Sequence, residues 1–456
     1  MSLIDALAAA LGPDAVTGPE AIPARNMADT TGLPPTRPRA LIRPRDVAGV
    51  SAALRLCHAA GQPVCVQGGM TGLAAGGHPG PEEIALSLER LVGIEEVDPD
   101  SATLTALAGT PLHSVQEAAR AAGFVCGIDL GARGSCTIGG NVATNAGGNQ
   151  VLRYGMARAN VLGLEAVLAD GTVVTRLNKM LKNNTGFDWT QLMIGSEGCL
   201  GVITRVVLAL HPDPGPVETA LLAVPDTAAL LAALRRLQAA FPAGLMVFEA
   251  MWGEFMALAE ERLGLTPAFA PRPEICVLVE IAAPRARVEA ALEELIATGL
   301  AGDAVLAGSG RDRARLWAFR ETPYEYHRLF PRFAGFDISF PRQAIARAVA
   351  AIRDEAAAHW PDRPMALFGH VADSNLHVIV GLPEGAPDGA AIEARIYALT
   401  GRLGGSVSAE HGIGRAKRRW LGLSRSPEEI ALMRALKRAL DPRGILNPGR
   451  VLPDPG

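Results

Sequence analysis

The sequence has few of the features that mark specialised protein classes. Its six cysteines lie far apart and include no C-x-x-C pair, which argues against a disulfide framework or a zinc knuckle and favours a reducing compartment. There is no run of 18 apolar residues, and the first residues lack the basic start and apolar stretch of a secretory signal. We therefore expect a cytoplasmic protein without a transmembrane segment. Docking at the periphery of a membrane stays open, because amphipathic contact leaves little trace in a sequence.

The net charge and the chain length further limit the kinds of protein that this sequence can encode. The 43 basic and 47 acidic residues give a net charge of -4, so no cationic excess suggests a nucleic-acid partner. A chain of 456 residues exceeds the usual size of one hydrophobic core, and we expect two or three compact units able to bury a large cofactor. The chain has neither a G-x-G-x-x-G dinucleotide fingerprint between a strand and a helix nor a Walker lysine.

The spacing of apolar residues predicts an α+β fold with many short strands. Residues 46–61 are expected to form an amphipathic helix that ends at Gly61, and Ser426 with Glu429 has the capping-box spacing of a second helix. Residues 211–220 are interpreted as a proline-rich linker and as the first domain boundary. Beyond them, strand–turn–helix patterns and a hairpin over residues 365–382 predict an antiparallel sheet backed by helices.

Glycine is concentrated in two loops. Seven glycines fall within residues 61–80 and eight within residues 127–155. A single cluster of this kind is more often a set of turns. Two long clusters, the second interleaved with short polar side chains, favour a surface that binds an extended ligand. The loop QGGMTGL directly follows a predicted strand and suits a pyrophosphate group.

Two histidines and a carboxylate form a candidate metal site. His370 and His377 lie seven residues apart around a predicted tight turn, and Glu410 is next to His411. Three protein ligands of this type leave coordination positions open, as in a catalytic site. A lone histidine is more often a packing or surface residue, so spacing alone leaves the metal open.

Seven motifs, taken in order, closely resemble the FAD-linked D-lactate and D-2-hydroxyglutarate dehydrogenases of the vanillyl-alcohol-oxidase flavoprotein superfamily. The resemblance covers residues 60 to 452, and its motifs are QGGMTGL, DLGARGSCTIGGNVATNAGG, LGLEAVLADGTVV, NTGFDWTQLMIGSEGCLGVIT, GHVADSNLH, SAEHGIG and LNPGRVL. It implies a two-subdomain FAD-binding domain over residues 1–212, an antiparallel-sheet substrate (cap) domain over residues 213–405, and a C-terminal segment, residues 406–456, that returns to the flavin.

The resemblance also implies the cofactor contacts. Members with covalent flavin carry a histidine in the first loop where this chain has Met70, which implies noncovalent FAD. The residues expected at the cofactor are Gly68, Gly69, Met70, Thr71 and Gly72 at the pyrophosphate; Gly134, Ser135, Gly139, Asn141, Thr144 and Gly148 along the flavin; Glu197, Gly198 and Ile203 on the adenine side; and Asn447 from the C-terminal end.

The reaction that the resemblance implies is the oxidation of a D-2-hydroxy acid to the 2-oxo acid. His370, His377 and Glu410 are expected to bind a divalent ion, taken to be zinc, although manganese and ferrous iron fit the same ligands. His411 is expected to accept the hydroxyl proton while the C2 hydride passes to flavin N5. Arg320 is expected to bind the C1 carboxylate, whereas an unplaced arginine on a helix is more often at the surface.

Three positions depart from the 2-hydroxyglutarate members: Gly335 replaces a lysine, Ile379 an asparagine and Tyr324 a threonine. Each change removes a polar anchor from the predicted distal end of the substrate pocket. Either the substrate has a short or apolar side chain, as in lactate, or another cation supplies the second anchor. The nearby candidates are His327, Arg328 and Arg332.

Several functional alternatives stay open. The electron acceptor is expected to be an external carrier such as electron-transfer flavoprotein, a quinone or a cytochrome, but an oxidase using oxygen has the same motifs. A third interpretation is a non-catalytic FAD-binding subunit of a larger glycolate-oxidase-like complex, against which the retained histidines and Glu410 argue. A homodimer is one assembly that stays open, and the particular D-2-hydroxy acid is unassigned.

Overall fold

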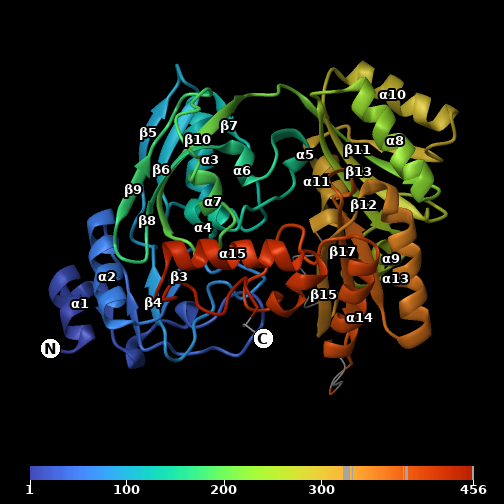
Figure 1. The fold of residues 1–456 in the computed structure, drawn as a ribbon. Helices are drawn as coiled ribbons and strands as arrows, with labels where there is room; N and C mark the ends of the chain where they lie inside the picture. The colour runs from blue at the N-terminus through green and yellow to red at the C-terminus, as the bar shows by residue number, and fades with distance from the viewer. Residues whose placement is uncertain (322–328, 331, 384, 386–388, 454–456) are drawn as a thin grey trace. The chain divides into compact units, whose positions relative to one another are not determined.

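The computed structural model describes residues 1–321, 329–330, 332–383, 385 and 389–453. Tyr324, His327 and Arg328 lie outside these described residues. The chain forms two compact units, the first of residues 1–148, 154–213 and 410–456 and the second of residues 149–153 and 214–409. Both combine helices with sheets, as Figure 1 shows, so the predicted α+β class is confirmed.

The first unit contains two sheets. In the smaller sheet, with the order β1-β2-β4-β3, strand β4 pairs in parallel with both β2 and β3, while β1 is antiparallel to β2. The larger sheet is antiparallel, with the order β5-β6-β10-β8-β9 and with β7 paired to β10. The strands are β1 (Val16–Thr17), β2 (Ala40–Ile42), β3 (Val64–Gln67), β4 (Ile84–Ser87), β5 (Ile94–Asp98), β6 (Thr103–Leu107), β7 (Phe124–Cys126), β8 (Val161–Val167), β9 (Val173–Arg176) and β10 (Val202–Pro212).

Helix ends in the first unit follow their capping residues. Helix α2 (Val47–Ala60) begins where the Asp46 side chain accepts from the Gly49 N–H and ends at Gly61, whose φ of 64° lies in the left-handed region. Helix α15 (Pro427–Leu440) begins with the capping box predicted from Ser426 and Glu429. The other helices are α1 (Leu3–Leu11), α3 (Leu112–Ala121), α4 (Ile138–Ala143), α6 (Ala157–Asn160) and α7 (Thr190–Met193), and α5 (Val151–Tyr154) includes residues of both units.

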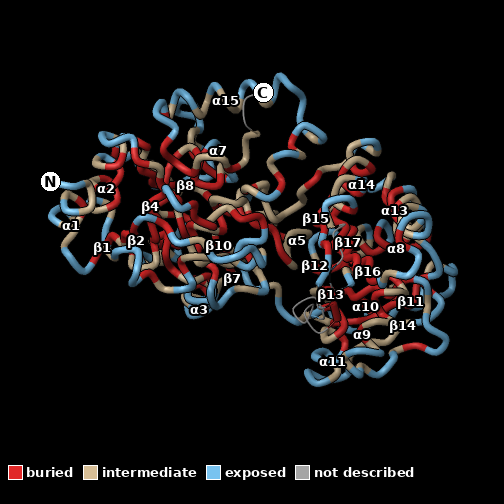
Figure 2. Tube along the Cα trace, turned by 90° about the horizontal axis from the view of Figure 1, so that it is seen from below, coloured by how far each residue is buried: buried red, intermediate tan, exposed pale blue. Residues whose placement is uncertain are grey.

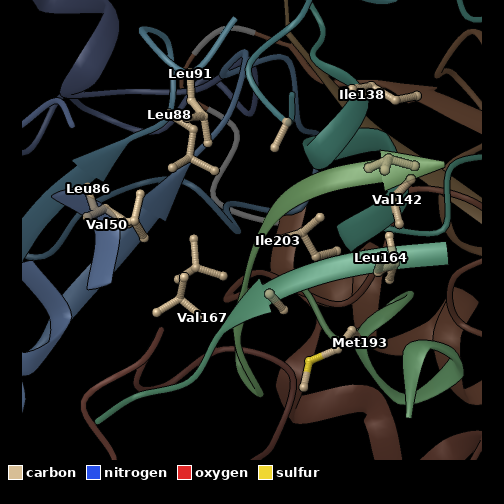
Figure 3. Packing of buried hydrophobic residues seen from close by; sticks show 14 of the residues in the cluster. Val50, Leu86, Leu88, Leu91, Ile138, Val142, Leu164, Val167, Met193 and Ile203 are labelled. Atoms are coloured by element: carbon tan, nitrogen blue, oxygen red, sulfur yellow. The ribbon is translucent and has the colours of Figure 1, made fainter. Parts of the chain in front are cut away.

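One apolar core joins the two sheets of the first unit. Val50 of α2 and Leu86 of β4 belong to the same cluster as Leu164 of β8 and Ile203 of β10, and Figure 3 shows them with Val142 of α4. Because each buried aliphatic side chain contributes about 1.5–3 kcal/mol, this cluster holds α4 firmly against the larger sheet. Residues flanking α4 are among those expected to contact the cofactor.

The interpretation of residues 211–220 as a linker was wrong for most of the segment. Strand β10 continues to Pro212, and its residues His211 and Pro212 pair with Val125 and Phe124 of β7. Proline is tolerated there because it ends the strand. The next strand begins at Val217, so only residues 213–216 connect the two strands.

The second unit is built on an antiparallel sheet, as the strand–turn–helix patterns predicted, and the part that the structure describes has seven strands. Among the described residues its strand order is β14-β11-β13-β12-β16-β17-β15. Figure 2 shows the inner strands as largely buried, whereas the edge strand β14 has no buried residue. The strands are β11 (Val217–Val224), β12 (Leu245–Trp252), β13 (Ile275–Ala282), β14 (Asp303–Leu306), β15 (Phe333–Ser339), β16 (Met365–Gly369) and β17 (Asn375–Gly381).

Helices cover both faces of this sheet. On one face, Phe255 of α9 and Phe319 of α11 pack with Met251 of β12 and Phe368 of β16. Helix α8 contacts β11 and β12 and buries Leu230, Leu234 and Leu237. The helices are α8 (Thr227–Ala240), α9 (Gly253–Leu263), α10 (Arg285–Ala297), α11 (Gly310–Glu321), α13 (Ile345–His359) and α14 (Gly389–Arg402). No helix among the described residues is long and apolar enough to cross a membrane.

Candidate active site

The two glycine-rich loops of the first unit lie directly against each other. A Cβ atom on Gly69 would lie 2.1 Å from the carbonyl oxygen of Ser135 and 2.8 Å from the Cα atom of Cys136. A Cβ on Gly68 would lie 2.8 Å from Thr137 Oγ1. Only glycine permits so close an approach, so residues 68–69 and 135–137 form one continuous backbone surface.

The first loop then turns sharply. Met70 has a φ of 58°, a conformation that residues other than glycine rarely adopt. The Met70 sulfur packs against Gly77, where a Cβ atom would lie only 3.0 Å from it. The loop therefore folds back on itself. The Thr30 hydroxyl donates to the carbonyl of Gly72 at 2.7 Å. Thr71 and Gly72 stay partly or fully exposed at the tip of the loop.

The second loop contains buried polar atoms without a partner. Thr137 Oγ1, at the N-cap of α4, and Asn141 Oδ1, within α4, are buried, and no described residue forms a hydrogen bond with either atom. Each such atom costs about 1–3 kcal/mol unless a partner is supplied. Hydrogen-bonding groups of a bound ligand would satisfy them, so this surface fits a large polar cofactor. The neighbouring Thr144 hydroxyl donates instead to the carbonyl of Gly140 at 3.0 Å.

Glycines elsewhere in the second loop permit tight packing. A Cβ on Gly139 would lie 2.5 Å from the Cβ of Ala108, and one on Gly148 would lie 2.0 Å from the carbonyl oxygen of Asp129. Gly134 has no such neighbour and is exposed, as is Ser135, whose hydroxyl donates to the carbonyl of Ala132 at 3.4 Å. Gly134 and Ser135 therefore belong to the part of this loop that is accessible to a ligand.

Glu197 and Asn447 join the C-terminal segment to the rest of the first unit. The Glu197 carboxylate accepts from the N–H groups of Ile413 and Gly414 at 2.7 and 2.8 Å. Burial raises the pKa of Glu197 although both donors oppose that shift. The Asn447 side chain accepts from the Val66 N–H at 2.7 Å and donates to the Glu197 carbonyl at 2.6 Å. Both side chains therefore fasten backbone segments together.

Gly198 and Ile203 have packing roles in the structure. A Cβ on Gly198 would lie 2.8 Å from Asn447 Nδ2, and Gly198 has a φ of 72°, so glycine is favoured there on both counts. Ile203 is buried in β10 within the apolar core. Neither offers a side chain to a ligand, and any cofactor contact at these positions must come from the backbone.

Arg450 is a further buried residue of the first unit that sequence reasoning missed. Its guanidinium donates to Glu83 Oε2 at 2.8 Å, to the carbonyl of His78 at 2.7 Å and to the carbonyl of Gly76 at 3.1 Å. The side chain is fully buried. Arg450 thus holds the far end of the first glycine-rich loop. The only signal was its place in the motif LNPGRVL.

In the second unit the hairpin of β16 and β17 brings two histidines together. Ring nitrogens of His370, just after β16, and His377, within β17, lie within 4.8 Å of each other, and the ring centroids are 6.0 Å apart. The Phe368 ring stacks on His377 with centroids 4.8 Å apart. Both histidines are less than 10% exposed. The pair of imidazoles is a suitable donor set for a divalent ion.

Arg320 lies beside these histidines and is not a surface residue. It sits near the end of α11 and is 6% exposed, so the interpretation as a surface arginine was wrong. Its Nε donates to Glu249 Oε2 at 2.5 Å, and its Nη2 lies 2.9 Å from His370 Nε2. A guanidinium held in this way keeps a fixed orientation, which suits the binding of a carboxylate.

Glu249 connects Arg320 and His370 and was not predicted. Its other oxygen, Oε1, lies 2.5 Å from His370 Nδ1. Burial would raise the pKa of Glu249, but Arg320 and His370 outweigh it and hold the pKa at about 2. The ionised carboxylate favours a proton on His370 Nδ1, which leaves Nε2 as the acceptor that faces Arg320 Nη2 at 2.9 Å. The available signal was one acid in the otherwise apolar strand LMVFEAMW.

Glu410 and His411 follow directly on a segment that is bound to this sheet. The Ser408 hydroxyl and the Ala409 N–H both donate to Asp337 Oδ2 at 3.2 Å, and Asp337 on β15 is paired with His377. Glu410 is the next residue, about 3.8 Å further along the chain. Within the first unit, Glu410 Oε2 accepts from the Gly148 N–H at 3.1 Å, and Glu410 Oε1 lies 3.9 Å from His411 Nε2.

Comparison with known proteins identifies the fold type and the protein family. The fold resembles p-cresol methylhydroxylase with a TM-score of 0.80, 98% of this chain and 96% of that chain being covered at 15% identity. That similarity establishes the vanillyl-alcohol-oxidase type of fold and nothing more. Residues 38–176 match the family described as FAD binding domain, and residues 214–451 match FAD linked oxidases, C-terminal domain. The chain belongs to the FAD-linked oxidase family.

Individual relatives are more specific. The mitochondrial D-2-hydroxyglutarate dehydrogenase of Bos taurus is 40% identical over 422 residues, which cover 91% of this chain and 77% of the relative. The D-2-hydroxyglutarate dehydrogenase of Xanthomonas citri pv. viticola is 38% identical over 429 residues, covering 91% of this chain and 89% of the relative. The family resemblance stated from the motifs is therefore confirmed.

Proposed function

We propose that this chain is an FAD-dependent dehydrogenase that oxidises a D-2-hydroxy acid to the 2-oxo acid. The observation that carries the proposal is the buried group of Arg320, Glu249, His370 and His377 in the second unit. Its arginine would bind the substrate carboxylate and its two histidines would bind a metal ion, which together suit a 2-hydroxy acid. The relatives with 38–40% identity are named for the oxidation of such an acid.

FAD would be held by the two glycine-rich loops. Gly68, Gly69, Met70, Thr71 and Gly72 offer backbone to its pyrophosphate, and Thr137 and Asn141 offer buried polar atoms that lack a partner among the described residues. The remaining expected contacts come from Gly134, Ser135, Gly139, Thr144, Gly148, Glu197, Gly198, Ile203 and Asn447. The flavin would be noncovalent, because a thioether at position 70 offers no nucleophilic nitrogen for a flavin linkage.

A divalent ion would be held by His370, His377 and Glu410. Two neutral imidazoles and one carboxylate leave open positions that the hydroxyl and carboxylate of a substrate can fill. Zinc is the first candidate, and manganese and ferrous iron accept the same ligands. The contact between Glu249 and His370 supports this assignment, since ligating histidines usually donate their other N–H to a carboxylate or carbonyl.

The residues of the chain would then divide the work of the reaction. Arg320 binds the C1 carboxylate and fixes the orientation of the substrate. His411 accepts the proton of the C2 hydroxyl, since an imidazole is the side chain most often used as a general base. When bound, the metal supplies a Lewis acid at the hydroxyl and FAD supplies a hydride acceptor at N5.

The electron acceptor and the cellular location are also proposals. We propose an external electron carrier, namely an electron-transfer flavoprotein, a quinone or a cytochrome, and a cytoplasmic enzyme that docks at a membrane if its carrier is a quinone. Reoxidation of the reduced flavin in air and with an artificial acceptor can be compared by stopped flow. Rapid reoxidation by air would identify an oxidase instead.

Anaerobic reduction of the bound flavin tests the proposal directly. D-2-hydroxy acids should bleach the flavin absorbance and their L enantiomers should not. His411→Ala should abolish the bleaching while FAD stays bound, whereas the matched variant His113→Ala, an exposed histidine of α3, should leave it unchanged. Faster bleaching by L enantiomers, or no bleaching by any 2-hydroxy acid, would overturn the proposal.

A further inference from the structure

A short N-terminal segment fastens both ends of the first glycine-rich loop. We call this segment, residues 26–36, the strap. Before the loop, Asn26 Nδ2 donates to Gln67 Oε1 at 3.1 Å, and Gln67 Nε2 donates to the Asn26 carbonyl at 3.0 Å. After the loop, Thr36 Oγ1 lies 3.2 Å from His78 Nε2. Asn26, Gln67 and His78 are at most 4% exposed, so both contacts involve buried side chains.

Between these two contacts, the strap reaches the tip of the loop through Thr30. The Thr30 hydroxyl donates to the carbonyl of Gly72 at 2.7 Å. A turn holds Thr30 in place, because the Asp29 carboxylate accepts from the N–H of Thr31 at 3.2 Å. Thr30 is exposed and belongs to no apolar cluster of the described residues. Its hydroxyl therefore acts on the loop rather than on the packing of the unit.

The loop contacts the rest of the first unit through its carbonyl groups and not through its N–H groups. Five carbonyls of the loop accept hydrogen bonds from elsewhere in the unit, namely those of Gly72, Ala74, Gly76, Gly77 and His78. In contrast, no backbone N–H of residues 68–78 donates to an acceptor among the described residues. Successive N–H groups of this kind can bind an anion.

The planarity of the peptide bond links the fixed carbonyls to the orientation of the N–H groups. In a trans peptide, such as the one between Gly72 and Leu73, the C=O and the N–H point in opposite directions. Because Thr30 holds the Gly72 carbonyl, the N–H of Leu73 is turned away from the strap. The fixed carbonyl of Gly76 orients the N–H of Gly77 in the same way. N–H groups held like this are preorganised for an anion, which increases its affinity.

From these contacts we infer that Thr30 is a positioning residue for the diphosphate of FAD. Thr30 acts through the Gly72 carbonyl, and its hydrogen bond holds the tip of the loop in the orientation that presents the Leu73 N–H to the diphosphate. The inference rests on the proposed function, because it requires FAD in this loop. It gives the strap a part in the cofactor site, although residues 26–36 precede residues 38–176, which match the FAD binding domain family.

Removal of the Thr30 hydroxyl tests the inference. Thr30→Val keeps the shape of the side chain but cannot donate a hydrogen bond, whereas Thr30→Ser keeps the hydroxyl. The holoenzyme is diluted stepwise, and the fluorescence of the released flavin gives the Kd for FAD. A hydrogen bond of ordinary net strength corresponds to about fivefold in an equilibrium constant, so the Kd should rise about fivefold in Thr30→Val. It should stay near the wild-type value in Thr30→Ser.

Two competing ligands separate an effect on the diphosphate from a general loosening of the site. ADP carries the diphosphate without the flavin, and riboflavin carries the flavin ring without any phosphate. Thr30→Val should weaken the competition of ADP with FAD by about the same factor as FAD itself and leave that of riboflavin unchanged. The matched control is Thr298→Val, which removes a hydroxyl that donates to the carbonyl of Glu294 at the end of α10, and it should change none of these affinities.

The outcomes also separate the inference from the proposed function. A Thr30→Val enzyme with the wild-type Kd for FAD refutes the inference and leaves the proposed function intact. The same holds if Thr30→Ser is as weak as Thr30→Val, or if ADP and riboflavin are weakened equally. A wild-type chain that binds no FAD refutes the proposed function, and the inference is refuted with it.

Discussion

Glu249→Gln is expected to destabilise the second unit and weaken metal binding together. Glu249 is 1% exposed, and its two oxygens lie 2.5 Å from Arg320 Nε and 2.5 Å from His370 Nδ1. Removing one partner of a buried ion pair costs about 3–5 kcal/mol, because the other charge stays buried without compensation. Glutamine keeps the shape and one acceptor, so we expect a loss near the lower limit, about 3 kcal/mol.

Two assays on the same samples measure this effect. Urea unfolding followed by circular dichroism gives the loss of unfolding free energy, and titration with zinc gives the metal affinity. Loss of the carboxylate that orients a ligating histidine should weaken metal binding by about 10- to 100-fold. The variant should keep FAD, because the glycine-rich loops belong to the first unit.

A second buried carboxylate of the same sheet provides the control. Glu280 on β13 is 5% exposed and accepts from Arg313, the Trp317 indole N–H and the Thr219 hydroxyl. Glu280→Gln should lower stability and leave zinc affinity unchanged. If Glu249→Gln and Glu280→Gln have the same zinc affinity, the role assigned to Glu249 is refuted.

Three further predictions follow from backbone and charge. Gly69→Ala should release FAD, because the added methyl would lie 2.1 Å from the Ser135 carbonyl oxygen; retention of flavin through gel filtration measures this. Ser374→Gly should raise the unfolding free energy by about 1 kcal/mol in urea titrations, since Ser374 has a φ of 80°. Burial raises the pKa of Glu83, but Arg450 outweighs burial and lowers it below the ordinary value of 4.5. The Glu83 contribution to stability is therefore complete above pH 4.5 and lost as the pH falls through the lowered pKa, so Glu83→Gln should cost less stability at pH 3.5 than at pH 7.

Local features of the fold could be predicted from the sequence because neighbouring residues determine them. The helix ending at Gly61, the capping box at Ser426 and the hairpin of β16 and β17 each depend on a few adjacent residues. The order of strands in the seven-stranded sheet could not be predicted in this way. Strand β12 pairs on one side with β13, the next strand in the chain, but on the other side with β16, which is far from it in the sequence, and such a distant pairing leaves no local signal.

For the candidate site, too, the sequence indicated the residues that are close in the chain and missed contacts between distant residues. Spacing indicated the pair His370 and His377, because a tight turn joins their strands. The contact between Arg320 and Glu249 joins residues 71 positions apart, and its strength comes from burial, which single-residue patterns do not report. Arg320 was for this reason compatible with a surface position until the fold was known.

The contacts of Asn447 and Arg450 set the order of events during synthesis. Residues up to Asp213 leave the ribosome well before either partner exists, and at about 5–20 residues per second the roughly 237 residues from there to Arg450 take roughly 12–47 s. In that interval Glu83 has no Arg450, and Val66 has no Asn447. The second unit, whose main segment ends at Ala409, can fold first. We therefore expect the nascent chain to capture its flavin only after residue 450 has emerged from the ribosome.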